Sequence, residues 1–238
     1  MSPGQSIGRA KNGSQKYIQD LVNYSPEYLN RLIFSNNASL MNYSNGKIEW
    51  VSPLDQENFK EYRDDRFLWP IRQAWYYKQL GKFWPSSGPQ WDALAIVYGA
   101  DGSEGVILVE AKANTLELGG PQYACQAKSQ NSIDMIQASF TTVKNAIGTG
   151  IESDWLGDYY QYANRIAHLY FLREICKVPT WLVYLYFVNG WVNQDPSIAK
   201  HWKESIATIY MQLGLPENHL LSDKMINIFP NINSDKRE

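Results

Sequence analysis

A pair of apolar segments around a turn-forming stretch constrains the fold of this chain more than any other feature. Residues 91–98 have the sequence WDALAIVY, residues 106–112 have VILVEAK, and residues 99–105 between them have GADGSEG. Gly, Asp and Ser favour turns, because they tolerate unusual backbone angles or form the local hydrogen bonds that turns require. Two short apolar runs joined by such a stretch predict a β-hairpin. The turn also accounts for the acids Asp101 and Glu104.

Helical signals precede the hairpin. Residues 52–55, SPLD, combine an N-cap serine, a proline suited to the first helical position and an acid that can close a capping box. They predict a helix over residues 53–67 or 53–68. The Trp-Pro pair at residues 69–70 is expected to break this helix, because the residue before a proline avoids the helical region, and a second helical stretch should end near residue 80.

The rest of the chain alternates between helical and strand patterns. An eight-residue apolar run, residues 181–188, predicts a buried strand. Capping residues before prolines, and apolar residues at helical spacing, predict further helices from residue 26 and over residues 133–147, 155–176 and 196–213. Because helices and strands interleave around an antiparallel pair, we expect an α/β or α+β fold, a three-layer sandwich with a central mixed β-sheet flanked by helices.

The length and composition indicate a folded chain with a sizeable core. The 238 residues are 44% hydrophobic and 14% aromatic, more than a disordered chain carries. No repeat or long linker interrupts the patterned segments. We therefore expect a single domain over residues 1–238, with the polar, Gly- and Ser-containing residues 1–15 flexible.

The net charge, the cysteines and the hydropathy limit the cellular location and the binding partners that we expect. A net charge of −2 excludes a strongly basic, histone-like protein but leaves open a nuclease with a local basic wall. The two cysteines and three histidines lack metal-ligand spacing, and no apolar N-terminal run is present, which favours a cytoplasmic protein. No apolar run is long enough to span a membrane, so no membrane partner is expected.

Three charged residues are predicted to meet at the open end of the hairpin. Side chains alternate along a strand, so Glu110 and Lys112 project from the same face. A turn centred near Gly102 would place Asp92 opposite a residue close to Lys112. Such a cluster at the end of an apolar hairpin costs free energy unless something compensates it.

A divalent cation would provide that compensation. Asp92 and Glu110 supply the hard oxygen ligands that Mg²⁺ or Mn²⁺ prefers, and the carbonyl of Ala111 can add another. Lys112 would then orient a water molecule or stabilise negative charge on a phosphate. The alternative is an ordinary surface ion pair between Glu110 and Lys112, with Asp92 capping a strand.

The arrangement resembles the PD-(D/E)XK nuclease superfamily, which has the restriction-endonuclease-like fold. The matching residues are PQWD at 89–92 and EAK at 110–112, and the resemblance covers about residues 52–148. Asp92 does not directly follow the proline, since Gln90 and Trp91 intervene. The resemblance implies metal-dependent hydrolysis of phosphodiester bonds, and an additional acid from the helix before the hairpin.

Glu61 is the preferred candidate for that additional acid, with Asp65 second. Residues placed at 100° intervals along the predicted helix put both on the face that borders the sheet, whereas Glu57 and Asp64 fall outside it. Glu61 is therefore expected to point toward the strand ends and Glu57 toward solvent. The alternative is that Glu61 pairs with Arg63 or Arg66 on a solvated surface.

The remaining polar residues give weaker indications. Gln137 and Lys144 border an apolar helix face, either within reach of a phosphate or on a solvated edge. Arg165 and His168 share a helix with several tyrosines, which would either bind nucleic acid or form a buried core with Arg165 in a salt bridge. Six basic residues form a candidate DNA-facing wall: Lys60, Arg63, Arg66, Arg72, Lys78 and Lys82.

These patterns together predict a Mg²⁺-dependent nuclease, with Asp92, Glu110, Lys112 and Glu61 as catalytic residues and DNA as the expected substrate. A non-catalytic interaction protein that keeps a nuclease-like fold as a scaffold is the alternative, since fold does not guarantee activity. A small-molecule enzyme using the same carboxylates is a third possibility.

Overall fold

A five-stranded mixed β-sheet organises the chain. The computed structural model describes residues 5–73, 76–86, 88–150, 152–188 and 197–231. The strand order is β2-β5-β6-β7-β8, and the pairs β2–β5 and β5–β6 are antiparallel whereas β6–β7 and β7–β8 are parallel. The strands are β2 (Glu49–Ser52), β5 (Ala93–Tyr98), β6 (Glu104–Lys112), β7 (Thr180–Tyr186) and β8 (Met225–Ile228).

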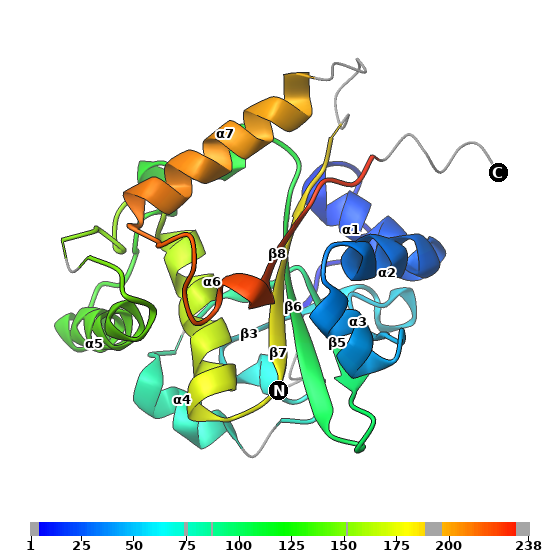
Figure 1. The fold of residues 1–238 in the computed structure, drawn as a ribbon, viewed down its shortest axis with the longest axis horizontal. Helices are drawn as coiled ribbons and strands as arrows, with labels where there is room; N and C mark the ends of the chain where they lie inside the picture. The colour runs from blue at the N-terminus through cyan, green and yellow to red at the C-terminus, as the bar shows by residue number, and fades with distance from the viewer. Residues whose placement is uncertain (1–4, 74–75, 87, 151, 189–196, 232–238) are drawn as a thin grey trace.

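Helices cover both faces of this sheet, which confirms the predicted three-layer α/β architecture (Figure 1). One face is packed by α1 (Gly13–Tyr24), α2 (Pro26–Ser35) and α3 (Ala38–Ser44). The other is packed by α4 (Tyr77–Phe83), α5 (Gln130–Ile147), α6 (Tyr160–Tyr170) and α7 (Ser197–Gln212).

Alternating side chains of the central hairpin divide the core in two. Ala93 and Ala95 face the α1–α3 layer, whereas Leu94 and Ile96 face the α4–α7 layer. All four are fully buried. A strand that is apolar on both faces requires cover on both sides, which is why residues 106–109 lack the polar alternation of an exposed sheet.

A small second sheet lies beside the hairpin, in the order β1-β3-β4. Its strands are β1 (Gln5–Ser6), β3 (Lys60–Arg63) and β4 (Gln90–Trp91). β3 pairs antiparallel with both neighbours, so Glu61 is opposite Gln5 and Tyr62 is opposite Trp91. This sheet brings residues from three distant parts of the chain to the start of β5.

The predicted helix over residues 53–68 is wrong. The segment contains a short 3₁₀ turn at Asp55–Glu57, strand β3 and a second 3₁₀ segment at Asp64–Leu68. Asn58 and Phe59 both have a φ of 54°, which no right-handed helix accommodates. Asn23 of α1 also accepts a hydrogen bond from the Asp55 N–H at 2.9 Å, so the residues predicted to start a helix are bound to α1 instead.

Other boundaries follow the prediction more closely. α2 begins at Pro26, and α5 ends before Gly148, whose φ of 74° forms the left-handed cap. α4 runs through Gly81 to Phe83, because Gly81 is not in a left-handed conformation and does not end the helix. α7 ends at Gln212, close to the expected Leu213, whereas its expected start at residues 195–196 lies outside the described residues.

The helix expected to start at Trp155 starts later, at Tyr160. Asp154 Oδ1 accepts the N–H groups of Leu156 and Gly157 at 2.9 and 3.0 Å, which forms a turn instead of a helix start. Beyond α6 the chain continues as a π-helical segment, Phe171–Ile175. Within the described residues, no helix is long and apolar enough to cross a membrane.

Candidate active site

The register of the hairpin places Asp92 next to Glu110. Ala93 pairs with Val109, so the position before β5 faces Glu110 and not a residue near Lys112. The expected register is two residues off, because the turn closes through a hydrogen bond from Gly99 N to Ser103 O at 2.8 Å and is centred on Asp101. Asp101 Oδ1 accepts the Ser103 N–H at 2.9 Å, which confirms its role in the turn.

The Asp92 carboxylate is anchored to the neighbouring strand. Its Oδ2 accepts the Ala111 N–H at 2.7 Å. Burial raises the pKa of Asp92 well above its usual range, and the negative charges of Glu110 and Glu61 raise it further, while Lys112 opposes them. The fold therefore keeps an acid where its charge is unfavourable without a cation.

Glu110 lies between two buried cations. Its Oε1 is 2.6 Å from Lys112 Nζ, and its Oε2 is 2.6 Å from Arg165 Nη2. The side chains of Glu110 and Lys112 are only 4% and 7% exposed, so the alternative of a surface ion pair is wrong. Burial alone would raise the pKa of Glu110, but Arg165 and Lys112 bring it below its usual value.

Lys112 is held as a charged group at the end of β6. Its Nζ also donates to Gln161 Oε1 at 2.8 Å and lies 6.0 Å from the centre of the Tyr123 ring. Burial opposes its charge, but Glu110 and Asp92 outweigh this effect and raise the pKa of Lys112.

Glu61 reaches the same cavity, although it does so from β3 and not from the predicted helix. Glu61 is 3% exposed, and its carboxylate accepts hydrogen bonds from Gln15 Nε2 at 3.2 Å and from Gln90 Nε2. Burial raises the pKa of Glu61, and the two amides partly offset this effect. The alternative of Glu61 on a solvated surface is therefore wrong.

Two other acids of residues 53–68, Glu57 and Asp65, were also considered in the prediction. Glu57 is half-buried and accepts a hydrogen bond from Tyr62 Oη at 3.2 Å, so its predicted exposure is only partial. The side chain of Asp65, the second choice for the upstream acid, lies outside the described residues.

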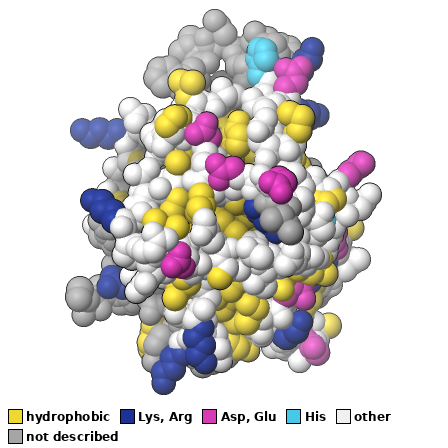
Figure 2. All heavy atoms as spheres, turned by 90° about the vertical axis from the view of Figure 1, so that its left-hand side faces the viewer, with side chains coloured by type: hydrophobic (Ala, Val, Ile, Leu, Met, Phe, Trp, Pro, Cys, Tyr) yellow, Lys and Arg dark blue, Asp and Glu magenta, His cyan; other side chains and the backbone are white. Residues whose placement is uncertain are grey.

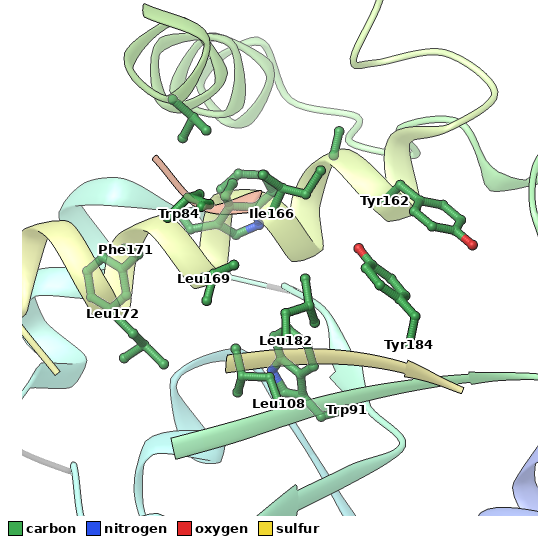
Figure 3. Close-up of a cluster of buried hydrophobic side chains, with 14 of the residues drawn as sticks. Trp84, Trp91, Leu108, Tyr162, Ile166, Leu169, Phe171, Leu172, Leu182 and Tyr184 are labelled. Atoms are coloured by element: carbon green, nitrogen blue, oxygen red, sulfur yellow. The ribbon is translucent and has the colours of Figure 1, made fainter. Parts of the chain in front are cut away.

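One cavity of about 630 Å³ joins these groups. Glu61, Asp92, Glu110 and Lys112 line it together with residues of α6 and of the segment 122–128. α6 is fixed to the sheet by a buried cluster in which Leu169 points from the helix toward Leu182 and Leu108 (Figure 3). The polar residues of α6 that line the cavity therefore stand on a rigid support.

Sequence reasoning did not assign the α6 residues of the site. Gln161 and Arg165 are four residues apart, a spacing that puts them on one helix face, and Asn164 lies beside them. Arg165 forms the buried salt bridge that the alternative for this helix proposed, but its partner is the candidate ligand Glu110. The sequence signal that could have identified these residues is the presence of polar side chains on a helix with many apolar ones.

The six basic residues do not form one wall along the cavity. Among the six, Arg63 lines it and donates to Gln90 Oε1 at 2.9 Å. Arg72 instead pairs with Glu49 at 2.8 Å and with Glu104 at 3.5 Å. Figure 2 shows that, on the α5 side of the molecule, basic and acidic side chains are interspersed around exposed hydrophobic ones, so this face has no single-sign field.

The two other polar candidates lie on α5. Lys144 is buried over the Trp155 ring and donates to Ser153 O, so it is not on a solvated edge. Gln137 is exposed, as the helix-edge alternative expects.

The donor set fits a small, hard cation. Asp92, directly before β5, and Glu110 of β6 provide carboxylate oxygens, and Ala111 of β6 provides a backbone carbonyl. Mg²⁺ is commonly bound through one or two carboxylates with several waters. No group of three or more His, Cys, Asp or Glu side chains suited to a metal ion occurs in the part of the chain that the structure describes. Any cation here would therefore depend on these two carboxylates, on the Ala111 carbonyl and on water.

Comparisons with protein-family models, with curated proteins and with solved structures found no match. The chemistry of the site therefore has to be inferred from its own residues.

Proposed function

We propose that the chain is a Mg²⁺-dependent nuclease of the PD-(D/E)XK type that hydrolyses phosphodiester bonds of nucleic acid, with DNA as the expected substrate. One observation carries the proposal. Asp92, directly before β5, and Glu110, on the antiparallel neighbour β6, share a cavity with Lys112 of β6, and all three are held by hydrogen bonds or ion pairs.

Each residue has a distinct part in this proposal. Asp92, Glu110 and the Ala111 carbonyl would hold Mg²⁺ or Mn²⁺, which when bound polarises a phosphate oxygen and acidifies a water molecule. Lys112 keeps a positive charge at the cavity, where it orients the attacking water or stabilises the charge that develops on the phosphate. Glu61 supplies an outer acid, positioned by Gln15 and Gln90.

The electrostatics of the cluster support a cation-binding role. If Asp92, Glu110 and Glu61 were all ionised, the cluster would carry one more negative charge than Lys112 and Arg165 compensate. Burial and the neighbouring acids raise the pKa of Asp92 and of Glu61 accordingly, and a bound cation would favour the ionised form of both. Buried charges contribute little to stability compared with apolar residues of similar size, so a purely structural cluster of this kind has no evident advantage. Acids whose pKa values are strongly perturbed in a cavity are typical of functional sites.

The cavity also offers positive charge for a polyanionic substrate. Arg63 and Lys128 line it and are exposed. Contacts from such residues to phosphates give nucleic-acid binding that is independent of sequence and sensitive to salt.

A non-catalytic scaffold is the second candidate, and one observation favours it. Lys112 and Arg165 together bind both oxygens of Glu110, so this acid is neutralised without any metal. In the scaffold, these ion pairs would be permanent. In the nuclease, Lys112 would release Oε1 while keeping Gln161 as a partner.

Cleavage and metal binding distinguish the two candidates. Linear DNA, circular DNA and RNA are incubated with the full chain in Mg²⁺ or Mn²⁺, and Mn²⁺ binding is measured by isothermal titration calorimetry. Asp92→Ala and Glu110→Ala should lose both metal binding and cleavage. Lys112→Ala should keep metal binding, because a competing positive charge disappears, while cleavage falls about 10²–10³-fold, as when one preorganised donor is removed.

Matched controls come from exposed residues of α7. Glu204→Ala and Lys200→Ala remove the same side-chain types where they are 59% and 76% exposed, and both should behave as wild type. A wild-type chain that cleaves none of the substrates and binds no Mn²⁺ would favour the scaffold. Cleavage by Lys112→Ala at the wild-type rate would remove Lys112 from the mechanism.

A further inference from the structure

Arg165 is buried beside the candidate ligands, and the proposed hydrolysis gives it no part. The residue is 4% exposed, and each of its three guanidinium nitrogens donates a hydrogen bond. Nε donates to Glu110 Oε2 at 2.7 Å, Nη1 to Asn164 Oδ1 at 2.7 Å and Nη2 to the Gln90 carbonyl at 3.0 Å. The guanidinium also lies over the Trp91 ring, 5.0 Å from its centre.

These contacts fix the guanidinium from three directions. Gln90 and Trp91 belong to β4, Glu110 belongs to β6, and Asn164 is its neighbour on α6. A planar guanidinium with this many partners cannot turn away from one of them without losing the others. Arg165 therefore holds Glu110 in a fixed position.

The two oxygens of Glu110 are consequently different. Oε2 is bound by both Nε and Nη2 of Arg165, at 2.7 and 2.6 Å. Oε1 is bound by Lys112 Nζ, which sits on a flexible side chain and has a second acceptor in Gln161 Oε1 at 2.8 Å. Oε1 is the oxygen that can be released.

We propose that Arg165 is a positioning residue. It occupies Oε2 of Glu110 and leaves Oε1 as the single oxygen with which Glu110 binds a cation. The proposal rests on the proposed function, since it requires a cation at Asp92 and Glu110.

The proposed role of Arg165 also assigns a cation preference. Ca²⁺ readily takes both oxygens of a carboxylate, whereas the smaller octahedral Mg²⁺ needs fewer protein oxygens and keeps its waters. A Glu110 restricted to one oxygen therefore favours Mg²⁺ and Mn²⁺ over Ca²⁺.

Isothermal titration of Mn²⁺ and of Ca²⁺ into the metal-free full chain tests this assignment. Wild type should bind Mn²⁺ more tightly than Ca²⁺. Arg165→Lys and Arg165→Met should weaken Mn²⁺ binding by about 10–100-fold, the usual effect of removing a group that orients a metal ligand. In Arg165→Met the preference for Mn²⁺ over Ca²⁺ should also fall, because Oε2 becomes accessible.

Arg173 provides a matched control. It follows Arg165 in the same helical region, donates to the Thr180 carbonyl at 3.0 Å and lies over the Trp181 ring, but it does not line the cavity. Arg173→Met should leave both affinities unchanged. A merely structural role for Arg165 would lower the fraction of binding-competent protein, not the ratio of the two affinities.

The outcomes separate this proposal from the proposed function. If wild type binds no Mn²⁺ and cleaves no substrate, both fail. If wild type binds and cleaves but both Arg165 variants bind the two cations as wild type does, the role of Arg165 is refuted and the nuclease proposal stands. If neither variant folds, as judged by circular dichroism, the wild-type titrations decide, and equal affinities for Ca²⁺ and Mn²⁺ would refute the one-oxygen arrangement.

Discussion

Replacing Glu110 by Gln should destabilise the metal-free protein strongly, although it keeps the size and shape of the side chain. Glu110 is the counterion of both Lys112, at 2.6 Å, and Arg165, at 2.6 Å. The side chains of these cations are 7% and 5% exposed, so water cannot replace the lost carboxylate. The substitution would leave two positive charges buried beside a neutral amide.

The expected loss can be estimated from the burial of these groups. Removing one partner of a buried ion pair costs about 3–5 kcal/mol, because the other charge stays buried without compensation. The lower end, about 3 kcal/mol, applies here because Asp92 also favours the charge of Lys112. For a chain of this size that corresponds to a fall in Tm of roughly 6–12 °C.

Urea unfolding in EDTA, followed by tryptophan fluorescence, measures this loss, with Glu117→Gln as the control. Glu117 lines the same cavity, but its partners are the neutral Ser14 Oγ at 3.3 Å and Asn114 Nδ2 at 2.6 Å. Its substitution should change the free energy of unfolding by less than about 1 kcal/mol. Equal losses in the two variants would refute the view that the Glu110 charge keeps Lys112 and Arg165 in place.

Two further predictions concern the charge of buried groups. Asp92→Asn should raise the free energy of unfolding in EDTA at pH 8 by about 1 kcal/mol, since burial and Glu110 both oppose the Asp92 charge; a decrease would contradict this. Burial lowers the pKa of His168 from 6.5 to about 3, so the stability that its neutral ring contributes is present above pH 6.5 and is lost as the pH falls toward 3. The loss should approach about 1.4 kcal/mol per pH unit below 6.5. His168→Leu should lack this part of the pH dependence in urea unfolding, and an unchanged slope would show that other groups cause it.

The central hairpin was predictable because its signals are local. Two short apolar runs, a Gly- and Asp-containing turn between them and the charged residues at the hairpin's open end all lie within residues 91–112. The register was not, since a shift of the turn centre by one residue, from Gly102 to Asp101, moves the partner of Asp92 by two positions. Local patterns identify a hairpin more reliably than they fix its register.

The segment before the hairpin shows why local capping signals fail. Residues 52–55 have the side chains of a helix start, but β3 pairs with residues far away in the sequence, Gln5–Ser6 and Gln90–Trp91. Glu61 was thus assigned to the cavity from a helical wheel that does not apply, and it reaches the cavity because β3 is placed there by the small sheet. Tertiary pairing outweighed the local preference.

Arg165 illustrates what a single sequence does not contain. The residue is 55 positions from Glu110, and nothing in the local pattern of α6 identifies its partner. Only the packing of α6 against β6 and β7 brings the two together.

Whether Asp92 and Glu110 hold one divalent cation between them is decided by anomalous diffraction from crystals of the full chain soaked in Mn²⁺. We expect one anomalous peak within bonding distance of Asp92, Glu110 Oε1 and the Ala111 carbonyl, with Arg165 still on Glu110 Oε2. The same soak of Asp92→Ala crystals should give no peak there. A wild-type crystal without a peak between Asp92 and Glu110, at Mn²⁺ concentrations that saturate binding in solution, would contradict the metal centre and with it the proposed nuclease.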